Sequence, residues 1–505
     1  MAGHFRGLLA DPPRKSFPDR PQFSGFMKPC RFEGEVRNLE IVGSVPVELD
    51  GTFYRVMPDP QFPPFIEDDP VRPLPSLLCF RPEADVTRLV PSGSTATETC
   101  QPSVSMTAMS TSSKSAYRNK YTDAVKFKIR TTANTNVLYF NGSLLAMKED
   151  APPYRMDPDT LETLGLCDFD GQLPSCTFTA HPKPDPVSGE LVCFGYEAKG
   201  DGTPDVCYFT IGPNGTFLET VWLVAPVVGM IHDFAVTENW VLFPIIPQIC
   251  DIERLKAGGE HWQWDPNVPF YLGVLPRRGA KGSDVRWFRA PNAFPGHTTN
   301  AYETSEGRII FDLPLTDKNA FFWWPDAAGN APAPHDIHAR YVRFHFDPRA
   351  DSLDLPPPTT ILRDDIEFPR IDGRVLARPH RHSFFVLMDP SLGTDLAAVL
   401  PAAGGGAPLY NALGHLDHHD GASSERYFPG PMHMVQEPVF VPRSPDAPEG
   451  DGFLVALVSN YAAMSSELHV IDTRNFSEAV AVVKLPMRLR AGLHGNWVDG
   501  KELRS

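Results

Sequence analysis

The feature that most restricts the fold of this chain is the alternation of short β-type runs with turn residues along almost its whole length. The sequence contains 53 prolines and 38 glycines. Proline and glycine end strands and form turns. The runs cover residues 135–149, 190–198, 206–224, 234–246, 339–347, 382–390 and 452–460. Long amphipathic helix patterns are nearly absent, so the sequence predicts an all-β fold.

The arrangement of these runs favours a β-propeller. Asn141-Gly142 separates two strand-like halves and predicts a tight hairpin. The best helix candidate, residues 251–262, is short, and the Gly/Ala-rich stretch 401–408 is typical of an internal loop. Many short strands over 505 residues suit a propeller, although no sharp repeat is visible. We expect a polar tail over residues 1–25 and one propeller domain over residues 26–505.

Composition excludes several classes of partner. The chain carries 46 basic and 62 acidic residues, a formal net charge of −16. Nucleic acids and anionic membrane surfaces attract basic patches, so neither is expected as a partner. No apolar run is long enough to span a bilayer, and the polar N-terminal region has no signal-peptide core. Eight scattered cysteines form no disulfide or metal framework, which predicts a reduced, cytoplasmic location.

One histidine lies in an unusual place. The stretch GMIHDF, residues 229–234, puts His232 inside an apolar run typical of a buried strand. A hydrogen-bonded core residue, a catalytic base and a metal ligand all remain open explanations. His181, His297 and His494 also follow small or apolar residues, and inner strands of a propeller converge on its axis. Most other histidines are expected to be exposed or locally hydrogen-bonded, among them His335, His338, His380, His382, His415, His418 and His419.

Several longer stretches carry a resemblance to a known family. They are residues 23–43, 51–60, 117–123, 131–136, 147–163, 169–175, 178–183, 229–239, 273–279, 321–327, 367–372 and 489–498. In combination they resemble the carotenoid cleavage oxygenases, and in particular the fungal branch that cleaves stilbenes such as resveratrol. The resemblance implies a seven-bladed β-propeller with a non-haem iron on its central axis, capped by loops and short helices.

The resemblance also assigns a metal site. It implies one Fe(II) per chain, held by His181, His232, His297 and His494. Neutral imidazoles suit Fe(II), and an unfilled position leaves room for O2. It further implies that glutamates accept hydrogen bonds from the ligand rings and orient them. These would be Glu149, Glu367 and Glu437. Thr135 matches a threonine that limits access to one open position of the iron.

Two more positions match the stilbene-cleaving branch. Tyr117 and Lys148 correspond to the pair that holds the 4-hydroxyl group of the substrate, and Glu367 corresponds to a residue that contacts the distal ring. A lysine ammonium and a tyrosine hydroxyl favour the phenolate, which pushes electrons into the central alkene. The implied reaction cleaves the interphenyl C=C bond with O2 and gives two aromatic aldehydes. The expected partners are therefore a small hydroxystilbene and O2, without strong membrane association.

One segment departs from the family pattern. Residues 73–116 are rich in Ser, Thr and Pro and lose the family's strand pattern, as an out-of-frame or wrongly spliced reading would. Three rivals stay open beside stilbene cleavage. In the first, the chain cleaves carotenoids or apocarotenoids. In the second, it is an inactive binding scaffold. In the third, it hydrolyses a substrate with metal-activated water. Four histidines argue against the last, because hydrolytic propellers generally use carboxylate and amide ligands.

Overall fold

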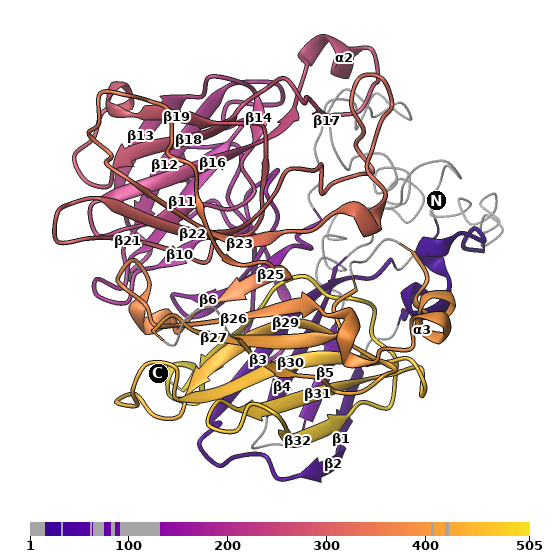
Figure 1. Cartoon of the computed structure of the whole chain (residues 1–505). Helices are drawn as coiled ribbons and strands as arrows, with labels where there is room; N and C mark the ends of the chain where they lie inside the picture. Colours follow the sequence, from indigo (N-terminus) through magenta and orange to yellow (C-terminus); the bar gives the residue numbers. More distant parts are fainter. Residues whose placement is uncertain are drawn as a thin grey trace, which may run out of the picture.

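The computed structural model describes residues 16–31, 34–60, 63, 75–81, 86–90, 132–405, 409–419 and 424–504. Within these residues strands dominate, and they pair into seven antiparallel sheets of four to six strands. The sheets follow one another in chain order, from the indigo N-terminal strands to the yellow C-terminal strands (Figure 1). The all-β prediction is confirmed, and so is the propeller arrangement.

The strands of the seven sheets have the following bounds. The first sheet contains β1 (Gly34–Arg37), β5 (Val86–Val90), β4 (Pro75–Arg81), β3 (Gly51–Pro58) and β33 (Gly495–Asp499). The second contains β6 (Asn136–Phe140), β7 (Ser143–Met147), β8 (Tyr154–Met156) and β9 (Thr163–Leu166). The third contains β10 (Lys183–Pro184), β11 (Leu191–Tyr196), β12 (Asp205–Ile211) and β13 (Phe217–Val224). The fourth contains β14 (Gly229–Met230), β15 (Ala235–Val236), β16 (Trp240–Ile249), β17 (Gln263–Trp264), β18 (Phe270–Pro276) and β19 (Arg286–Ala290).

The remaining three sheets complete the order. The fifth contains β20 (Phe294–Pro295), β21 (Asn300–Glu303), β22 (Ile309–Thr316), β23 (Arg340–Phe346) and β24 (Thr359–Leu362). The sixth contains β25 (Asp365–Arg370), β26 (His382–Met388), β27 (Ala412–Asp417) and β28 (Ser424–Tyr427). The seventh contains β29 (His433–Pro442), β30 (Gly452–Asn460), β31 (Ser465–Asp472), β32 (Ala479–Lys484) and the early strand β2 (Glu40–Gly43).

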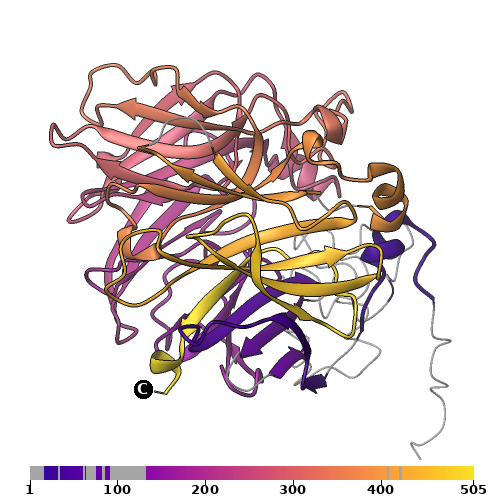
Figure 2. The same ribbon diagram turned by 60° about the horizontal axis from the view of Figure 1, so that its bottom comes forward.

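The two ends of the described chain are joined through these sheets. β33 pairs with β3, with Trp497 opposite Phe53, and β2 pairs with β32, with Ile41 opposite Val483. Each end therefore adds a strand to a sheet built mainly from the other end, and the indigo and yellow strands lie side by side in Figure 2. Such pairing covers strand edges that would otherwise be open to other chains.

The hydrophobic core lies between neighbouring sheets. Val56 of β3 and Val137 of β6 belong to one buried cluster, between the first and second sheets. Phe194 of β11 packs edge-on against Phe243 of β16, between the third and fourth sheets, with ring centroids 5.6 Å apart. The strand β16 is buried on both faces and therefore reads as a nearly continuous apolar run.

Several local predictions can be compared with the structure. The hairpin at Asn141-Gly142 is confirmed: both residues have positive φ, 48° and 76°, as a two-residue type I′ turn requires. The helix expected within 251–262 is α2 (Ile252–Lys256), shorter than the pattern. The loop predicted at 401–408 is wrong at its start, because residues 401–403 end α3 (Leu396–Ala403) with Pro401 inside the helix.

The departing segment and the N-terminal region are only partly described. Within residues 73–116, β4 and β5 pair with β3 and β1, so this part of the segment does supply strands. Residues 91–116 lie outside the described residues. Phe23, in the region expected to be a polar tail, is buried beside the 3-10 turns Pro21–Phe23 and Gly25–Met27. No helix in the described parts of the chain is long and apolar enough to cross a bilayer.

Candidate metal centre

Four histidines from four separate segments meet at one point. Their ligand nitrogens all lie within 4.8 Å of one another, and the four residues are His181, His232, His297 and His494. The ring centroid of His181 lies 4.7 Å from the ring centroid of His232, 5.2 Å from that of His297 and 4.5 Å from that of His494. The Nε2 atoms of His232 and His297 are 3.1 Å apart. The structure thus brings together all four histidines that the sequence singled out.

Each histidine lies at the end of a short strand. His181 comes shortly before β10, His232 follows β14, His297 follows β20, and His494 precedes β33. Because β10, β14 and β20 have only two residues each, the backbone leaves the sheet where the ring turns toward its neighbours. The site is therefore built from the ends of four sheets, and no local sequence motif holds it.

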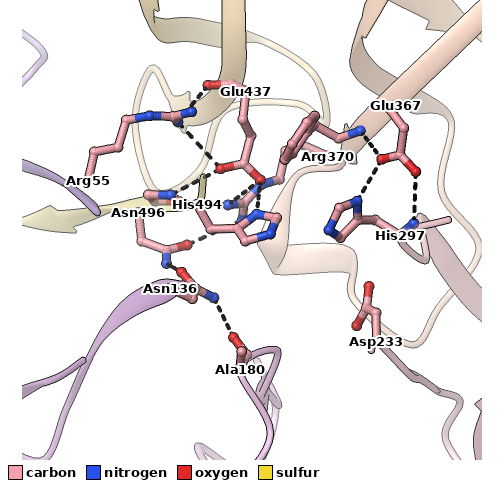
Figure 3. Close-up of polar contacts among 12 residues, drawn as sticks. Arg55, Asn136, Ala180, Asp233, His297, Glu367, Arg370, Glu437, His494 and Asn496 are labelled. Carbon is pink, nitrogen blue, oxygen red and sulfur yellow. Dashed lines mark hydrogen bonds and ion pairs between the residues drawn. The ribbon is translucent and has the colours of Figure 1, made fainter. Parts of the chain in front are cut away.

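Three of the rings are oriented by glutamates. Nδ1 of His297 lies 2.6 Å from Glu367 Oε2, and Nδ1 of His494 lies 2.8 Å from Glu437 Oε1 (Figure 3). Nδ1 of His232 forms the same contact with Glu149. A carboxylate on Nδ1 fixes the tautomer in which Nε2 carries the lone pair and can bind a metal.

His181 supplies the test of whether a metal fits. It has no glutamate partner, and its Nε2 atom is buried without a hydrogen-bond partner among the described residues. A buried ring nitrogen left unpaired is costly unless a ligand satisfies it. The other three Nε2 atoms face the same space, so the donor set fits a cation that prefers imidazole ligands.

Two of the glutamates sit on irregular strands. The register of β25 against β26 shifts between Glu367 and Arg370, where Phe368 has φ of 49°. The register of β29 against β30 shifts between Val435 and Pro438, the stretch that contains Glu437. A bulge redirects side chains from the regular alternation of a strand. Here a bulge accompanies two of the three glutamates that contact the clustered histidine rings.

Glu437 carries a buried charge that several donors share. Arg370 contacts its Oε1 atom at 2.9 Å, the amide of Gly495 donates to Oε2 at 3.0 Å, and Arg55 lies 3.6 Å from Oε2 (Figure 3). Burial opposes the ionised form, but Arg370 and His494 outweigh it, so the pKa of Glu437 lies well below its ordinary value. The carboxylate stays charged and keeps its hold on His494.

Asp233 connects segments that carry clustered histidines, a role that no sequence pattern indicated. Its Oδ1 atom accepts from Lys183 at 2.7 Å, and its Oδ2 atom accepts from the amide of Thr298 at 2.8 Å. These partners lie close in sequence to His181 and directly after His297. One carboxylate therefore ties together three histidine-bearing segments.

A series of hydrogen bonds also connects residues close to the clustered histidines. Arg370 donates to Asn496 at 3.2 Å, Asn496 donates to Asn136 at 3.2 Å, and Asn136 donates to the carbonyl of Ala180 at 2.8 Å (Figure 3). Sequence reasoning missed these residues as well. The only available signal was that Asn136, Arg370 and Asn496 fall inside stretches that carry the family resemblance.

The environment sets different protonation for the rings. Burial, reinforced by the neighbouring histidines, holds the pKa of His181 well below its ordinary value. Burial also lowers the pKa of His494 to about 4, although Glu437 opposes this. Burial works against the charged form of His232 too, but Glu149 outweighs it and raises that pKa. The neutral rings of His181 and His494 are ready to bind a metal.

The remaining predicted site residues are placed unequally. Thr135 is buried next to the cluster, and its carbonyl accepts from the amide of His494 at 3.2 Å. Lys148 follows β7, directly before Glu149, and its ammonium forms an ion pair with Asp150. Tyr117 lies outside the described residues, so its predicted contact with the substrate stays a prediction.

Comparison with known proteins identifies relatives along nearly the whole chain. The family model described as retinal pigment epithelial membrane protein matches residues 27–499. Resveratrol cleavage oxygenase 1 of Aspergillus fumigatus is 59% identical over 497 residues, covering 97% of this chain and 98% of that protein. Carotenoid cleavage oxygenase 1 of Neurospora crassa is 52% identical over 501 residues, covering 97% of this chain and 93% of that protein.

A solved structure agrees with the fold. The crystal structure of Pseudomonas brassicacearum lignostilbene dioxygenase is 40% identical and superimposes with a TM-score of 0.87, covering 96% of this chain and 100% of that one. The matches extend across every segment that carries a clustered histidine. The chain therefore belongs to the family of the retinal pigment epithelial membrane protein, the carotenoid cleavage oxygenases.

Proposed function

We propose that this protein is an Fe(II)-dependent dioxygenase that cleaves the interphenyl C=C bond of hydroxystilbenes such as resveratrol. One observation carries the proposal: four histidines, two buried and two half-buried, meet at one point, and glutamates orient three of them, in a chain 59% identical to a resveratrol cleavage oxygenase. Each oxygen atom of O2 ends in one of two aromatic aldehydes, so no external reductant is needed.

The four histidines would hold one Fe(II), whose chemistry when bound is the activation of O2. Glu149, Glu367 and Glu437 would keep the rings in place. We also propose that the seven sheets are the seven blades of a single propeller domain, with the metal on its axis. Support comes from the sheet order and from the histidines, which reach one point from different sheets. A cytoplasmic location stays a prediction of the sequence.

Lys148 and Tyr117 would bind the 4-hydroxyl group of the stilbene. The ammonium of Lys148 is largely buried, and it stands one residue from Glu149, which contacts a clustered histidine. A buried cation stabilises a phenolate more strongly than water does, and the phenolate donates electrons toward the alkene. Glu367 would accept a hydrogen bond from a hydroxyl group of the distal ring and would at the same time hold His297.

Turnover of resveratrol by iron-loaded protein in air tests the proposal. We expect 4-hydroxybenzaldehyde and 3,5-dihydroxybenzaldehyde as products, and no cleavage of the 4-methoxy analogue. Lys148→Met should lower kcat/KM by about 100-fold, as the loss of one buried donor does. Lys199→Met removes an exposed lysine that also pairs with an aspartate, so it should not change turnover.

Two other outcomes would replace the proposal. Cleavage of a carotenoid with resveratrol left intact would assign the chain to the activity named for the Neurospora crassa relative. Iron-loaded protein that cleaves neither substrate would indicate an inactive scaffold. Equal activity on resveratrol and its 4-methoxy analogue would remove the role given to Lys148.

A further inference from the structure

A second group of metal-ligand side chains lies away from the four histidines. We propose that Glu197, Cys250 and His261 form a binding site for one divalent cation of the zinc class. Their ligand atoms all lie within 4.8 Å of one another, and all three residues are buried. Thiolate, imidazole and carboxylate are the ligands that Zn²⁺ uses in proteins, and three of them leave one tetrahedral position open.

Three separate segments supply these ligands. Glu197 follows β11, Cys250 follows β16, and His261 lies between α2 and β17. His261 Nε2 is 2.8 Å from Glu197 Oε2, and the imidazole is also hydrogen-bonded to the thiol of Cys250. Glu197 has φ of 48°, an uncommon conformation for a residue other than glycine and one that often marks functional sites.

The backbone around the site is held in place. The guanidinium of Arg254 donates to the carbonyls of Ile249 and His261, at 2.6 and 3.0 Å. These two carbonyls flank or belong to the ligand residues, so one side chain fixes both segments. The amide of Gly202 donates to the second oxygen of Glu197 at 2.6 Å. A site whose ligands are positioned in advance loses less entropy when a cation binds.

Charge balance favours a divalent cation. A carboxylate, a thiolate and a neutral imidazole together carry two negative charges, which one divalent cation neutralises. The occupied cluster would therefore leave no uncompensated charge in the interior.

Another cluster of similar composition does not support a cation in the same way. Asp312, His380 and His418 also have ligand atoms within 4.8 Å of one another. Arg343, however, binds both carboxylate oxygens of Asp312, at 2.7 and 2.6 Å. The guanidinium of Arg343 therefore already neutralises the carboxylate of Asp312. The partner of Glu197 is instead His261, which is itself one of the proposed ligands.

Cobalt is the probe that separates this site from the four histidines. A Co²⁺ ion bound by a thiolate absorbs in the near ultraviolet through sulfur-to-metal charge transfer, and the four-histidine cluster contains no sulfur. We expect iron-loaded protein titrated with Co²⁺ to gain this band at one equivalent. Cys250→Ser should lose the band, and Cys176→Ser, which changes an exposed cysteine, should retain it.

The titration of the unsubstituted protein can by itself overturn the proposal. Absence of a sulfur band with correctly loaded iron would mean that Glu197 and His261 form only a structural ion pair. A band that persists in Cys250→Ser would place the cobalt at another cysteine. The four-histidine cluster contains no sulfur and cannot produce the band, so failure here is distinct from failure of the proposed reaction.

Discussion

Glu149 links the candidate metal centre to a residue that no sequence pattern singled out. Its Oε2 atom accepts from the hydroxyl of Tyr196 at 2.5 Å, while its Oε1 atom contacts the ring of His232. Tyr196 is buried and stands directly before Glu197. The phenol therefore positions a carboxylate that in turn positions a ring, which makes Tyr196 a positioning residue.

Tyr196→Phe should weaken metal binding without unfolding the protein. The substitution leaves Glu149 with one donor fewer, so the ring of His232 is less firmly oriented. We expect the affinity for Fe(II), measured by competition with a chelator, to fall by about 10-fold. Tyr139→Phe removes a phenol whose hydroxyl donates to the carbonyl of Glu502, and it should bind iron normally. Equal iron affinity in both variants would contradict the role of Tyr196.

The sequence predicted that His380 is either exposed or locally hydrogen-bonded; it is buried, and its hydrogen-bond partner Asn300 lies 80 positions away. Its side chain faces Asp312 at 3.7 Å, Asn300 at 3.2 Å and the ring of His418 at 4.8 Å. Burial, together with Arg343, lowers the pKa of His380 to about 3. The unfolded chain, with an ordinary histidine pKa near 6.5, therefore binds this proton first as the pH falls.

The consequence is a loss of stability on acidification. Between about pH 6.5 and 5 the folded ring stays neutral while the unfolded ring gains its proton, so the free energy of unfolding falls by about 1 kcal/mol per pH unit from this group. His380→Gln should flatten that slope in urea unfolding experiments. His335→Gln, which alters an exposed histidine, should leave the slope unchanged. Parallel slopes for His380→Gln and the original chain would show that the ring is not neutral when folded.

At the scale of elements, the irregular strand ends matter more than the regular strands. The bulge in β25 directs Glu367 toward the segment after β20, where Gly296 precedes His297. A side chain at Gly296 would meet Glu367: a Cβ there would lie 2.1 Å from Oε1. The glycine is therefore needed for close approach of a carboxylate.

Gly296→Ala should damage the site while sparing the fold. The crowded atom is the end of a flexible side chain, so Glu367 can move aside at little cost in stability and releases His297 as it does so. We expect iron affinity to fall by about 10- to 100-fold and thermal stability to change little. Gly373→Ala, where a Cβ meets no atom within 4 Å, is the matched control. Unchanged iron binding in Gly296→Ala would remove the proposed function of this contact.

The same elements show what the sequence could predict. Strand runs and the Asn141-Gly142 turn are local patterns, and they were read correctly. The four histidines were found through the family resemblance, because their convergence depends on the whole fold. The hydrogen bonds that hold the segments around the histidines in place were missed, because the two partners are far apart in sequence. Arg55 meets Glu437 across 382 positions, and Asn496 meets Asn136 across 360. The packing of the sheets determines which of these distant residues meet, and a short stretch of sequence does not predict that packing.

At the scale of the whole molecule, the pairing of β33 with β3 joins the last described sheet strand to the first sheet. Val498 of β33 is buried in the cluster formed by the first and second sheets, together with Val56 and Val137. The strand also begins directly after His494. Closure of the sheet and completion of the histidine cluster are therefore one structural event.

Val498→Ala tests this coupling. Removing two buried methyl groups should lower the free energy of unfolding by about 2 kcal/mol and speed the release of iron. Val47→Ala truncates a fully exposed valine and should change stability by less than about 0.5 kcal/mol. The measurements are urea unfolding and the rate of iron transfer to a chelator. A loss of stability without faster iron release would separate closure from the metal centre.

The position of His494 also bears on how the protein is made. Three of the clustered histidines leave the ribosome long before the fourth, and the glutamate that orients the fourth lies 57 positions ahead of it. A nascent chain that ends before β33 therefore cannot assemble the complete set of rings. The order of the histidines along the chain therefore means that the full four-histidine set forms only after the residues of the other sheets have been synthesised.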